Sequence, residues 1–211
     1  MRHAPFTIRW ITLTAVCLLS LSACATLDQS ECQQANWRAI GFEDGSKGEL
    51  PSRIGRHRKA CAKHGVTPDL AAYQDGHRQG LEQFCTEPNG FRYGKSGRAY
   101  NGVCPAELDP PFLAGYRKGK ELHTAKQHLS QAESTLASHQ RDLERIDKKI
   151  AKTEQQLISS ATSEVQRKTL LTQLKDLQHQ QIDLESEIPF LQQTVDDKKA
   201  LYNDLRQRYV Y

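Results

Sequence analysis

The sequence has little of what the common enzyme and membrane classes require. It contains one long apolar run, near the N-terminus, which excludes a polytopic membrane protein. Basic residues exceed acidic ones only by 29 to 25, so we expect no nucleic-acid partner. No G-x-S-x-G, H-E-x-x-H, Walker or paired-carboxylate motif is present. We therefore expect no catalytic residues, no cofactor and no metal, although an enzyme is not excluded.

Glycine is absent after residue 119, although 13 glycines precede that point. Only one of the eight prolines, Pro189, lies later. The distal part is instead rich in Leu, Gln, Lys and Glu, the composition of long helices. Composition therefore predicts two domains after the N-terminal region, a glycine-rich one over 32–119 and a helical one over 120–211.

The N-terminal apolar run follows basic residues and covers Trp10–Leu21. It is too short to span a hydrocarbon layer of ~30 Å and is typical of a secretory signal. The run ends in Leu-Ser-Ala-Cys at Cys24, which resembles the lipobox of bacterial lipoproteins. The resemblance implies removal of residues 1–23, lipid (palmitate included) on Cys24, and a short linker over 24–31. An ordinary secretory signal remains the alternative.

The resemblance also implies a location. Ala25 follows the cysteine, where the inner-membrane retention signal of enteric lipoproteins has Asp. By that analogy we expect the lipid to anchor the chain to the outer membrane, facing the periplasm. Three acyl chains, as such lipoproteins carry, would hold a protein on a membrane stably.

Four further cysteines would lie in that oxidising compartment: Cys32, Cys61, Cys85 and Cys104. Their spacing contains no C-x2-C pair, which argues against a zinc site. They predict two disulfides with three possible pairings. Sequential pairing closes the shortest loops and is favoured, but the other two pairings stay open.

A seven-residue repeat runs through the distal part. Leucine or isoleucine occupies every seventh position from Leu122 to Leu157, and a second stripe runs from Leu170 to Leu205 with a gap at Lys198. Each stripe has a second register beside it: Ala125, Ala132, His139, Ile146, Thr153 and Ser160 for the first, and Leu174, Gln181, Ile188, Val195, Tyr202 and Tyr209 for the second. Such paired stripes are typical of the a and d positions of a coiled coil. The two stripes are out of phase, because 13 residues rather than 14 separate Leu157 from Leu170.

One continuous coiled coil would need a local overwinding there, so a turn is the simpler interpretation. Residues 159–163 are small and polar, and Ser163 with Gln166 fits a capping box that begins a new helix. The sequence therefore predicts a long antiparallel coiled-coil hairpin, with arms over 118–158 and 163–208.

In the proximal part, aromatic residues and glycines recur at helical spacing. The three sets are Trp37, Gly41, Gly45, Gly48; Tyr73, Gly76, Gly80, Phe84; and Phe112, Gly115, Gly119, Leu122. Glycine inside a helix costs ~1 kcal/mol against alanine, so we expect close helix–helix contact to offset it. Turns at the glycines, with short helices between them, are the alternative. Residues 91–105 are predicted to form a loop.

These segments together resemble an uncharacterised family of bacterial lipoproteins, the domain of unknown function 2799. The residues that carry the resemblance are Cys32, Trp37, Gly41–Gly45, Ala60–Gly65, Tyr73, Gly76, Gly80, Leu81–Cys85, Tyr100–Pro105 and Phe112. The resemblance implies a lipoprotein location and a cysteine framework, and it implies no activity. The coiled coil lies beyond it.

Three polar residues near the glycine faces form a possible ligand site: Asp44, Asp75 and His77. An Asp–His pair can act as general acid and base, although packing beside glycine explains both aspartates equally well. The run from Arg53 to Lys63 holds five basic residues and suits an anionic lipid or glycan. A solvated helix face is the alternative interpretation.

The expected fold is mainly α, a small disulfide-stapled, glycine-rich helical domain followed by the coiled-coil hairpin. The expected function is that of a non-enzymatic envelope protein, which uses the coiled coil to bind an envelope partner, to self-associate or to act as a scaffold. The alternative is a module that binds or hydrolyses cell-wall or envelope glycans through its Gly/Asp/His-rich domain.

Overall fold

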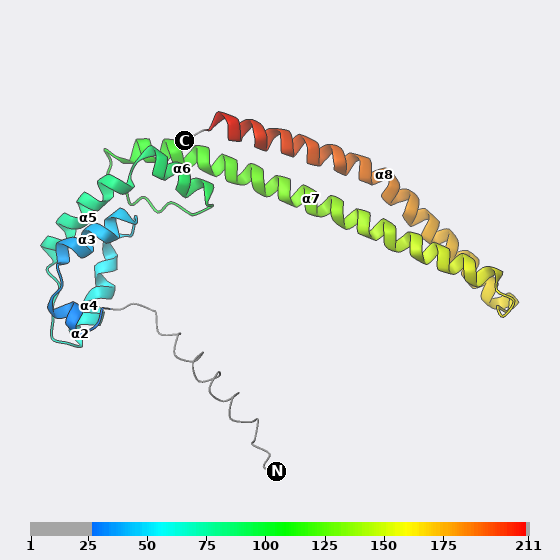
Figure 1. Ribbon diagram of the computed structural model, residues 1–211, viewed down its shortest axis with the longest axis horizontal. Coiled ribbons are helices and arrows are strands. Elements are labelled where there is room, and N and C mark those ends of the chain that lie inside the picture. Colours follow the sequence, from blue (N-terminus) through cyan, green and yellow to red (C-terminus); the bar gives the residue numbers. More distant parts are fainter. Residues whose placement is uncertain (1–26, 210–211) are drawn as a thin grey trace, which may run out of the picture. The chain divides into compact units, whose positions relative to one another are not determined.

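The computed structural model describes residues 27–209, so the expected signal peptide and Cys24 lie outside the described residues. Within this range the chain is helical and contains no strand (Figure 1). The elements are α2 (Gln29–Gln33), α3 (Trp37–Ser46), the 3-10 helix η2 (Pro51–Arg53), α4 (Ile54–Ala62), α5 (Leu70–Phe84), α6 (Glu87–Lys95), α7 (Asp109–Ile158) and α8 (Glu164–Arg208). None of these helices combines the length and the apolar character that a membrane span requires. The mainly α fold is confirmed.

The chain forms two compact units. The first contains the described residues up to Cys85 together with Gly102–Leu108, and the second contains Thr86–Asn101 and the described residues from Asp109 onward. This division does not coincide with the change of composition near residue 120. Helix α6 and the glycine-containing start of α7 belong to the same unit as the hairpin.

Both disulfides lie in the first unit and have the sequential pairing. Cys32 of α2 pairs with Cys61 of α4, with a Cα–Cα distance of 5.4 Å. Cys85, the C-cap of α5, pairs with Cys104 at a Cα–Cα distance of 5.7 Å. The cysteine framework predicted from spacing is therefore present.

In the first unit, α3 and α5 pack through their glycines. A Cβ atom on Gly41 would lie 2.0 Å from the carbonyl oxygen of Tyr73, and one on Gly76 would lie 1.9 Å from that of Arg38. Gly45 lies against His77 in the same way. Contacts that advance in the same direction along both helices make the pair parallel. Only residues without a Cβ allow backbones to approach this closely.

The second unit repeats the arrangement with α6 and α7. A Cβ on Gly90 would lie 2.0 Å from the carbonyl oxygen of Phe112, and one on Gly115 would lie 2.0 Å from that of Glu87. The glycines of these pairs therefore mark close helix contacts rather than turns. The predicted loop over 91–105 is wrong for residues 91–95, which belong to α6. Thr86 caps that helix, and its glycines are packed against α7.

The repetition extends past the helix ends. Gly48 follows α3 with φ +71° and lies under the Phe84 ring, while Gly97 follows α6 with φ +78° and lies under the His123 ring. Each of these glycines is the third residue after the second glycine of its helix. Glycine adopts positive φ readily and other residues rarely do, so the backbone conformation at positions 48 and 97 requires glycine. The two units thus contain two copies of one supersecondary structure.

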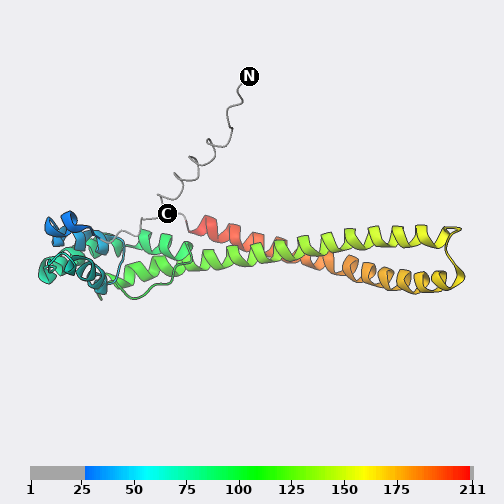
Figure 2. The same ribbon diagram turned by 90° about the horizontal axis from the view of Figure 1, so that it is seen from below.

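Helices α7 and α8 form the predicted antiparallel hairpin and lie side by side in both views (Figures 1 and 2). Buried positions beyond the glycines fall on the predicted stripes: Leu122, Ala125, Leu136, Ile146 and Thr153 on α7, and Leu177, Val195 and Leu205 on α8. Polar stripe residues also join the arms. Gln181 donates a 2.8 Å hydrogen bond to Asp147, and His139 lies 3.2 Å from Glu187.

The hairpin turn is fixed by hydrogen bonds from α8. Ser163 and Gln166 form the predicted capping box. The guanidinium group of Arg167 donates to the carbonyl oxygens of Leu157, Ser159 and Thr162 at 2.6, 2.9 and 3.2 Å. These include carbonyl groups at the end of α7 that have no partner within their own helix. The Arg167 side chain therefore caps the C-terminal end of α7 and fixes the start of α8 beside it.

Candidate functional site

Asp44 is at the centre of a polar cluster in the first unit. Its carboxylate is buried, with 6% of the residue exposed. The Tyr73 hydroxyl donates to Oδ2 at 2.9 Å, and His57 Nε2 lies 2.8 Å from the same oxygen. Arg53 Nε lies 3.3 Å from Oδ1. This last contact is an ion pair without hydrogen-bond alignment, because Arg53 Nε has no hydrogen-bond partner.

His77, the second residue of the predicted site, belongs to the same cluster. Its Nε2 lies 2.7 Å from the carbonyl oxygen of Glu49, and since that oxygen can only accept, Nε2 carries the hydrogen. The imidazole stacks on the Tyr73 ring with centroids 5.9 Å apart. Burial, together with the hydrogen bond to Asp44, raises the pKa of Tyr73 well above its usual value.

Asp75, the third residue, lies apart from this cluster. Its carboxylate pairs with Arg38 at 3.1 Å and with Arg78 at 2.6 Å, and both contacts are on the exposed side of the α3–α5 pair. Position 75 directly precedes the first glycine of α5, whereas position 44 directly precedes the second glycine of α3. The two aspartates are therefore not equivalent in the glycine pattern and point to different surroundings.

The cluster can hold a charge, but its groups are largely engaged with one another. Asp44 accepts from two donors and faces a cation, the usual condition for a buried carboxylate. Glu49, Arg53 and His57 also belong to it, although the sequence did not assign them to the possible ligand site. Their signal was weak, because Arg53 and His57 lie within a basic run that suits a solvated face equally well.

No group of three or more His, Cys, Asp and Glu side chains in residues 27–209 is arranged to hold a metal ion. Glu49 contributes its carbonyl oxygen to His77, while its carboxylate pairs with Arg53 at 3.2 Å. The cluster's contacts join the end of α3, the following loop, α4 and α5. Such a network ties these segments together around a buried charge.

The hairpin presents a different kind of surface. Several large apolar side chains on its two helices are exposed: Ile158, Val165, Leu171, Ile182, Phe190 and Leu201. Ile182 is 59% exposed and Phe190 is 76% exposed. These values are high for residues whose burial is favoured by 1.5–3 kcal/mol or so each.

Two of these side chains lie on one face of α8 with a proline between them. Ile182, Ser186, Pro189 and Phe190 are spaced i, i+4, i+7 and i+8, which places them on one side of the helix. All four are exposed, and this side faces away from Leu177, which is buried against α7. We call these four residues the outer face of α8.

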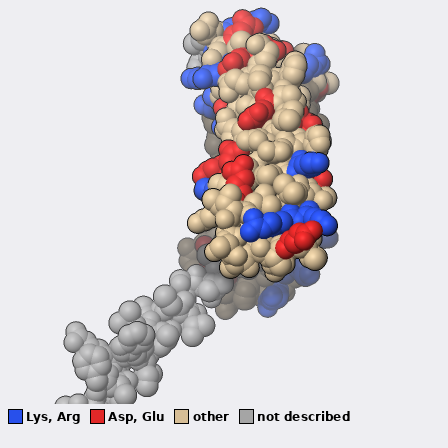
Figure 3. Space-filling view, turned by 90° about the vertical axis from the view of Figure 1, so that its right-hand side faces the viewer, with Lys and Arg blue, Asp and Glu red and all other residues tan. Residues whose placement is uncertain are grey.

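Charge around the outer face of α8 differs from charge at the turn end of the hairpin. Between Lys175 and Lys198, α8 carries six acidic residues and no lysine or arginine. Seen from the end that carries the hairpin turn, basic and acidic side chains are interspersed among uncharged ones (Figure 3). Ion pairs along the arms are mostly within one helix, such as Lys148 with Glu144 and Arg208 with Asp204. The outer face of α8 is therefore apolar and is flanked by exposed acidic side chains, namely Asp183, Glu185 and Glu187.

Residues 36–121 match a family described as "Protein of unknown function (DUF2799)". The match begins at Asn36, the N-cap of α3, and ends in α7 just after Gly119, so it contains both glycine-packed pairs. Residues 36–121 are therefore similar to this family, as the sequence motifs indicated, and the coiled-coil hairpin continues beyond them. No curated protein and no solved structure matches the chain.

Proposed function

We propose that this chain is a lipid-anchored envelope protein that binds a helix of another envelope protein through the outer face of α8. It is a binding or scaffolding protein, not an enzyme. The observation that carries the proposal is the exposure of Ile182 and Phe190 on the side of α8 opposite the hairpin seam. Contiguous exposed apolar residues rimmed by polar ones are typical of interaction sites.

A helix is the ligand that this surface fits best. Ile182, Pro189 and Phe190, spaced i, i+7 and i+8, form an apolar stripe of the kind that packs against another helix. Because α7 already covers the opposite side of α8, a bound helix would extend the two-helix coiled coil to three helices. Ser186, between the apolar residues, is small enough for close approach.

The proposed location rests on features outside the hairpin. The N-terminal run and Cys24 have the pattern of a lipoprotein signal. The two disulfides favour an oxidising compartment such as the periplasm. Ala25 favours the outer membrane over the inner. Together they support a chain held at the periplasmic side of the outer membrane.

The proposal is tested by photo-crosslinking in living cells. A photoreactive amino acid replaces Ile182 or Phe190 on the outer face of α8, and adducts are identified by mass spectrometry. Gln140 and Gln155 of α7 are matched control positions, because both are exposed on the other arm. We expect one envelope protein to be captured at Ile182 and Phe190 and not at the control positions.

Other outcomes would overturn parts of the proposal. If the chain formed adducts only with other copies of itself, the partner would be a second copy and not another envelope protein. Adducts of equal yield at all four positions would show that the outer face of α8 has no special role. If a well-expressed protein formed no adducts, the proposal that the hairpin binds a partner would be contradicted.

A further inference from the structure

The first unit contains a second surface, a basic groove beside α4. One wall of the groove is a side of α4 with three cationic residues and one alanine. These residues are spaced i, i+3, i+4 and i+7 along the helix: Arg56, Lys59, Ala60 and Lys63. Leu27 and Asp28 form the opposite wall, and His64 closes one end. The groove has a volume of about 550 Å³.

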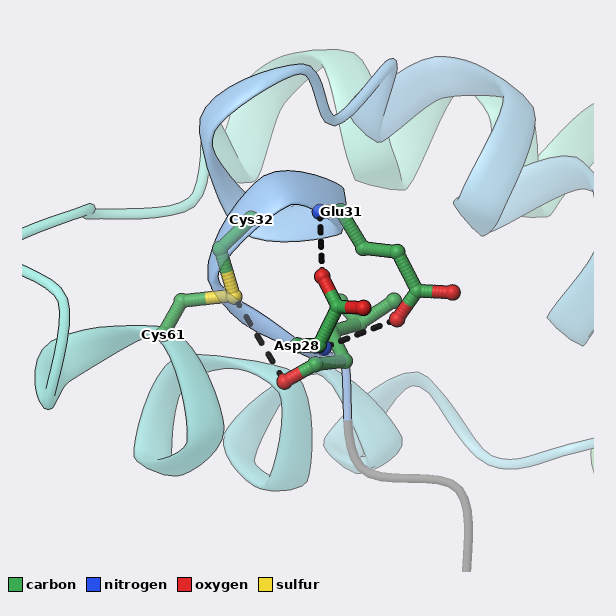
Figure 4. The surroundings of a disulfide bond; sticks show 5 residues. Asp28, Glu31, Cys32 and Cys61 are labelled. Atoms are coloured by element: carbon green, nitrogen blue, oxygen red, sulfur yellow. Dashed lines mark hydrogen bonds between the residues drawn. A yellow bond between two sulfur atoms is a disulfide. The ribbon is translucent and has the colours of Figure 1, made fainter.

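A disulfide joins the two walls, and a capping box fixes Asp28 on α2 (Figure 4). Cys32 and Cys61, both buried, join α2 to α4. The Asp28 carboxylate accepts from the backbone N–H of Glu31 at 2.8 Å, and Glu31 in turn accepts from the backbone N–H of Asp28 at 2.8 Å. The wall opposite α4 therefore has a fixed position before any ligand binds.

The charge of the groove is positive and uncompensated. Arg56, Lys59 and Lys63 are exposed and form no ion pair with any residue in the range 27–209. Helix α4 contains no acidic residue. Against these three cations the groove has one carboxylate, Asp28, which already caps α2. Three unpaired cations along one helix face suit a phosphate group, which lysine binds as a point charge.

We propose that this groove binds the phosphate of an anionic lipid headgroup at the membrane surface. Leu27 is three residues from Cys24, and three extended residues span at most ~11 Å. A lipid on Cys24 therefore keeps the groove within reach of the headgroups of the membrane that it anchors to. The assignment of a lipid headgroup rather than free phosphate rests on the proposed anchoring through Cys24. The groove and its positive charge do not depend on that anchoring.

The test uses the mature chain, residues 24–211, with Cys24→Ser so that the anchor contributes nothing. Co-sedimentation is measured with vesicles of phosphatidylcholine, and with vesicles of phosphatidylcholine and phosphatidylglycerol in equal parts. The groove variant is Lys59→Gln with Lys63→Gln. Its matched control is Lys152→Gln with Lys175→Gln, which removes the same charge from exposed positions of the hairpin.

We expect binding to the anionic vesicles only, weakened at least about tenfold by the groove variant and little changed by the control. Equal losses in both variants would show general charge attraction and overturn the groove assignment, as would an absence of binding by the wild-type chain. Binding of inorganic phosphate through the same lysines without vesicle binding would overturn the lipid assignment. None of these outcomes depends on the outer face of α8, so crosslinking and this assay fail independently.

Discussion

Gly41 of α3 lies so close to Tyr73 of α5 that a Cβ atom on the glycine would be 2.0 Å from the tyrosine carbonyl oxygen. Gly90 and Phe112 have the same relationship in the second unit, with the same distance. Tyr73 and Phe112 are both fully buried beside these contacts. The glycines therefore place these two large aromatic side chains, one in each unit.

The close contact predicts that Gly41→Ala destabilises the protein. The methyl group would meet backbone atoms that cannot move without separating α3 from α5, so we expect a loss of about 1–3 kcal/mol in the free energy of unfolding. Gly55→Ala in α4 is the matched control, because nothing lies within 4 Å of its Cβ position. We expect that variant to gain up to ~1 kcal/mol from helix propensity. Urea unfolding measures both, and equal behaviour would contradict the packing described.

The disulfides predict similar losses of stability when removed. They close loops with sequence separations of 29 and 19 residues. Loop-closure entropy then gives about 3–4 kcal/mol for each. Replacing both members of a pair by serine, Cys32 with Cys61 or Cys85 with Cys104, avoids a free thiol. Thermal unfolding of both double variants checks the estimate, and an unchanged midpoint in either would show that its bond contributes little.

The raised pKa of Tyr73 predicts a loss of stability at alkaline pH. Burial and the hydrogen bond to Asp44 make the folded protein keep the phenol proton at a pH where the unfolded chain, with a tyrosine pKa of ~10, has lost it. The free energy of unfolding should then fall as pH rises above about 10, by up to ~1.4 kcal/mol per pH unit for this group. Tyr73→Phe should be less stable at neutral pH and have a flatter alkaline limb. Parallel curves for the two proteins would contradict the assignment.

Arg167 predicts the stability of the hairpin turn. Arg167→Ala removes the hydrogen bonds to three carbonyl oxygens at the turn. We expect faster amide exchange in residues 158–166, with a local loss of roughly 1–3 kcal/mol. Lys168→Ala is the neighbouring control, since it removes only an exposed ion pair with Glu164, worth less than about 1 kcal/mol. Equal exchange in both variants would mean that Arg167 does not hold the turn.

The hairpin could be predicted because a heptad pattern is local and repeated. The phase change between Leu157 and Leu170 placed the turn, and the capping residues Ser163 and Gln166 placed the start of α8. The glycine faces of α3, α5 and α7 were predicted for the same reason. Helix α6 was missed because Gly90 and Gly94 lie among other glycines, and only the packed partner α7 shows that they are helical.

The candidate site was predicted less well. Asp44 and His77 do lie in one cluster, and Tyr73 connects them. Its hydroxyl donates to Asp44 and its ring stacks on His77, and no sequence pattern indicated that hydroxyl. Asp75 was grouped with Asp44 because both precede a glycine, yet they precede different glycines of the pattern. Which surroundings a side chain faces depends on where the neighbouring helix packs, as well as on the residue's spacing along its own helix. That information is not present in one sequence.

The most direct test of binding through α8 compares two variants at one fixed crosslinking position. The photoreactive amino acid replaces Gln193, which is exposed on the same side of α8 as Ile182. We expect Ile182→Ser with Phe190→Ser to lower the adduct yield at least about tenfold, because each side chain contributes about 1.5 kcal/mol or more when buried by a partner. Asp75→Asn, which changes a half-buried residue of the alternative ligand site, should leave the yield unchanged. An unchanged yield in the apolar double variant, or a loss caused by Asp75→Asn, would contradict binding through the outer face of α8.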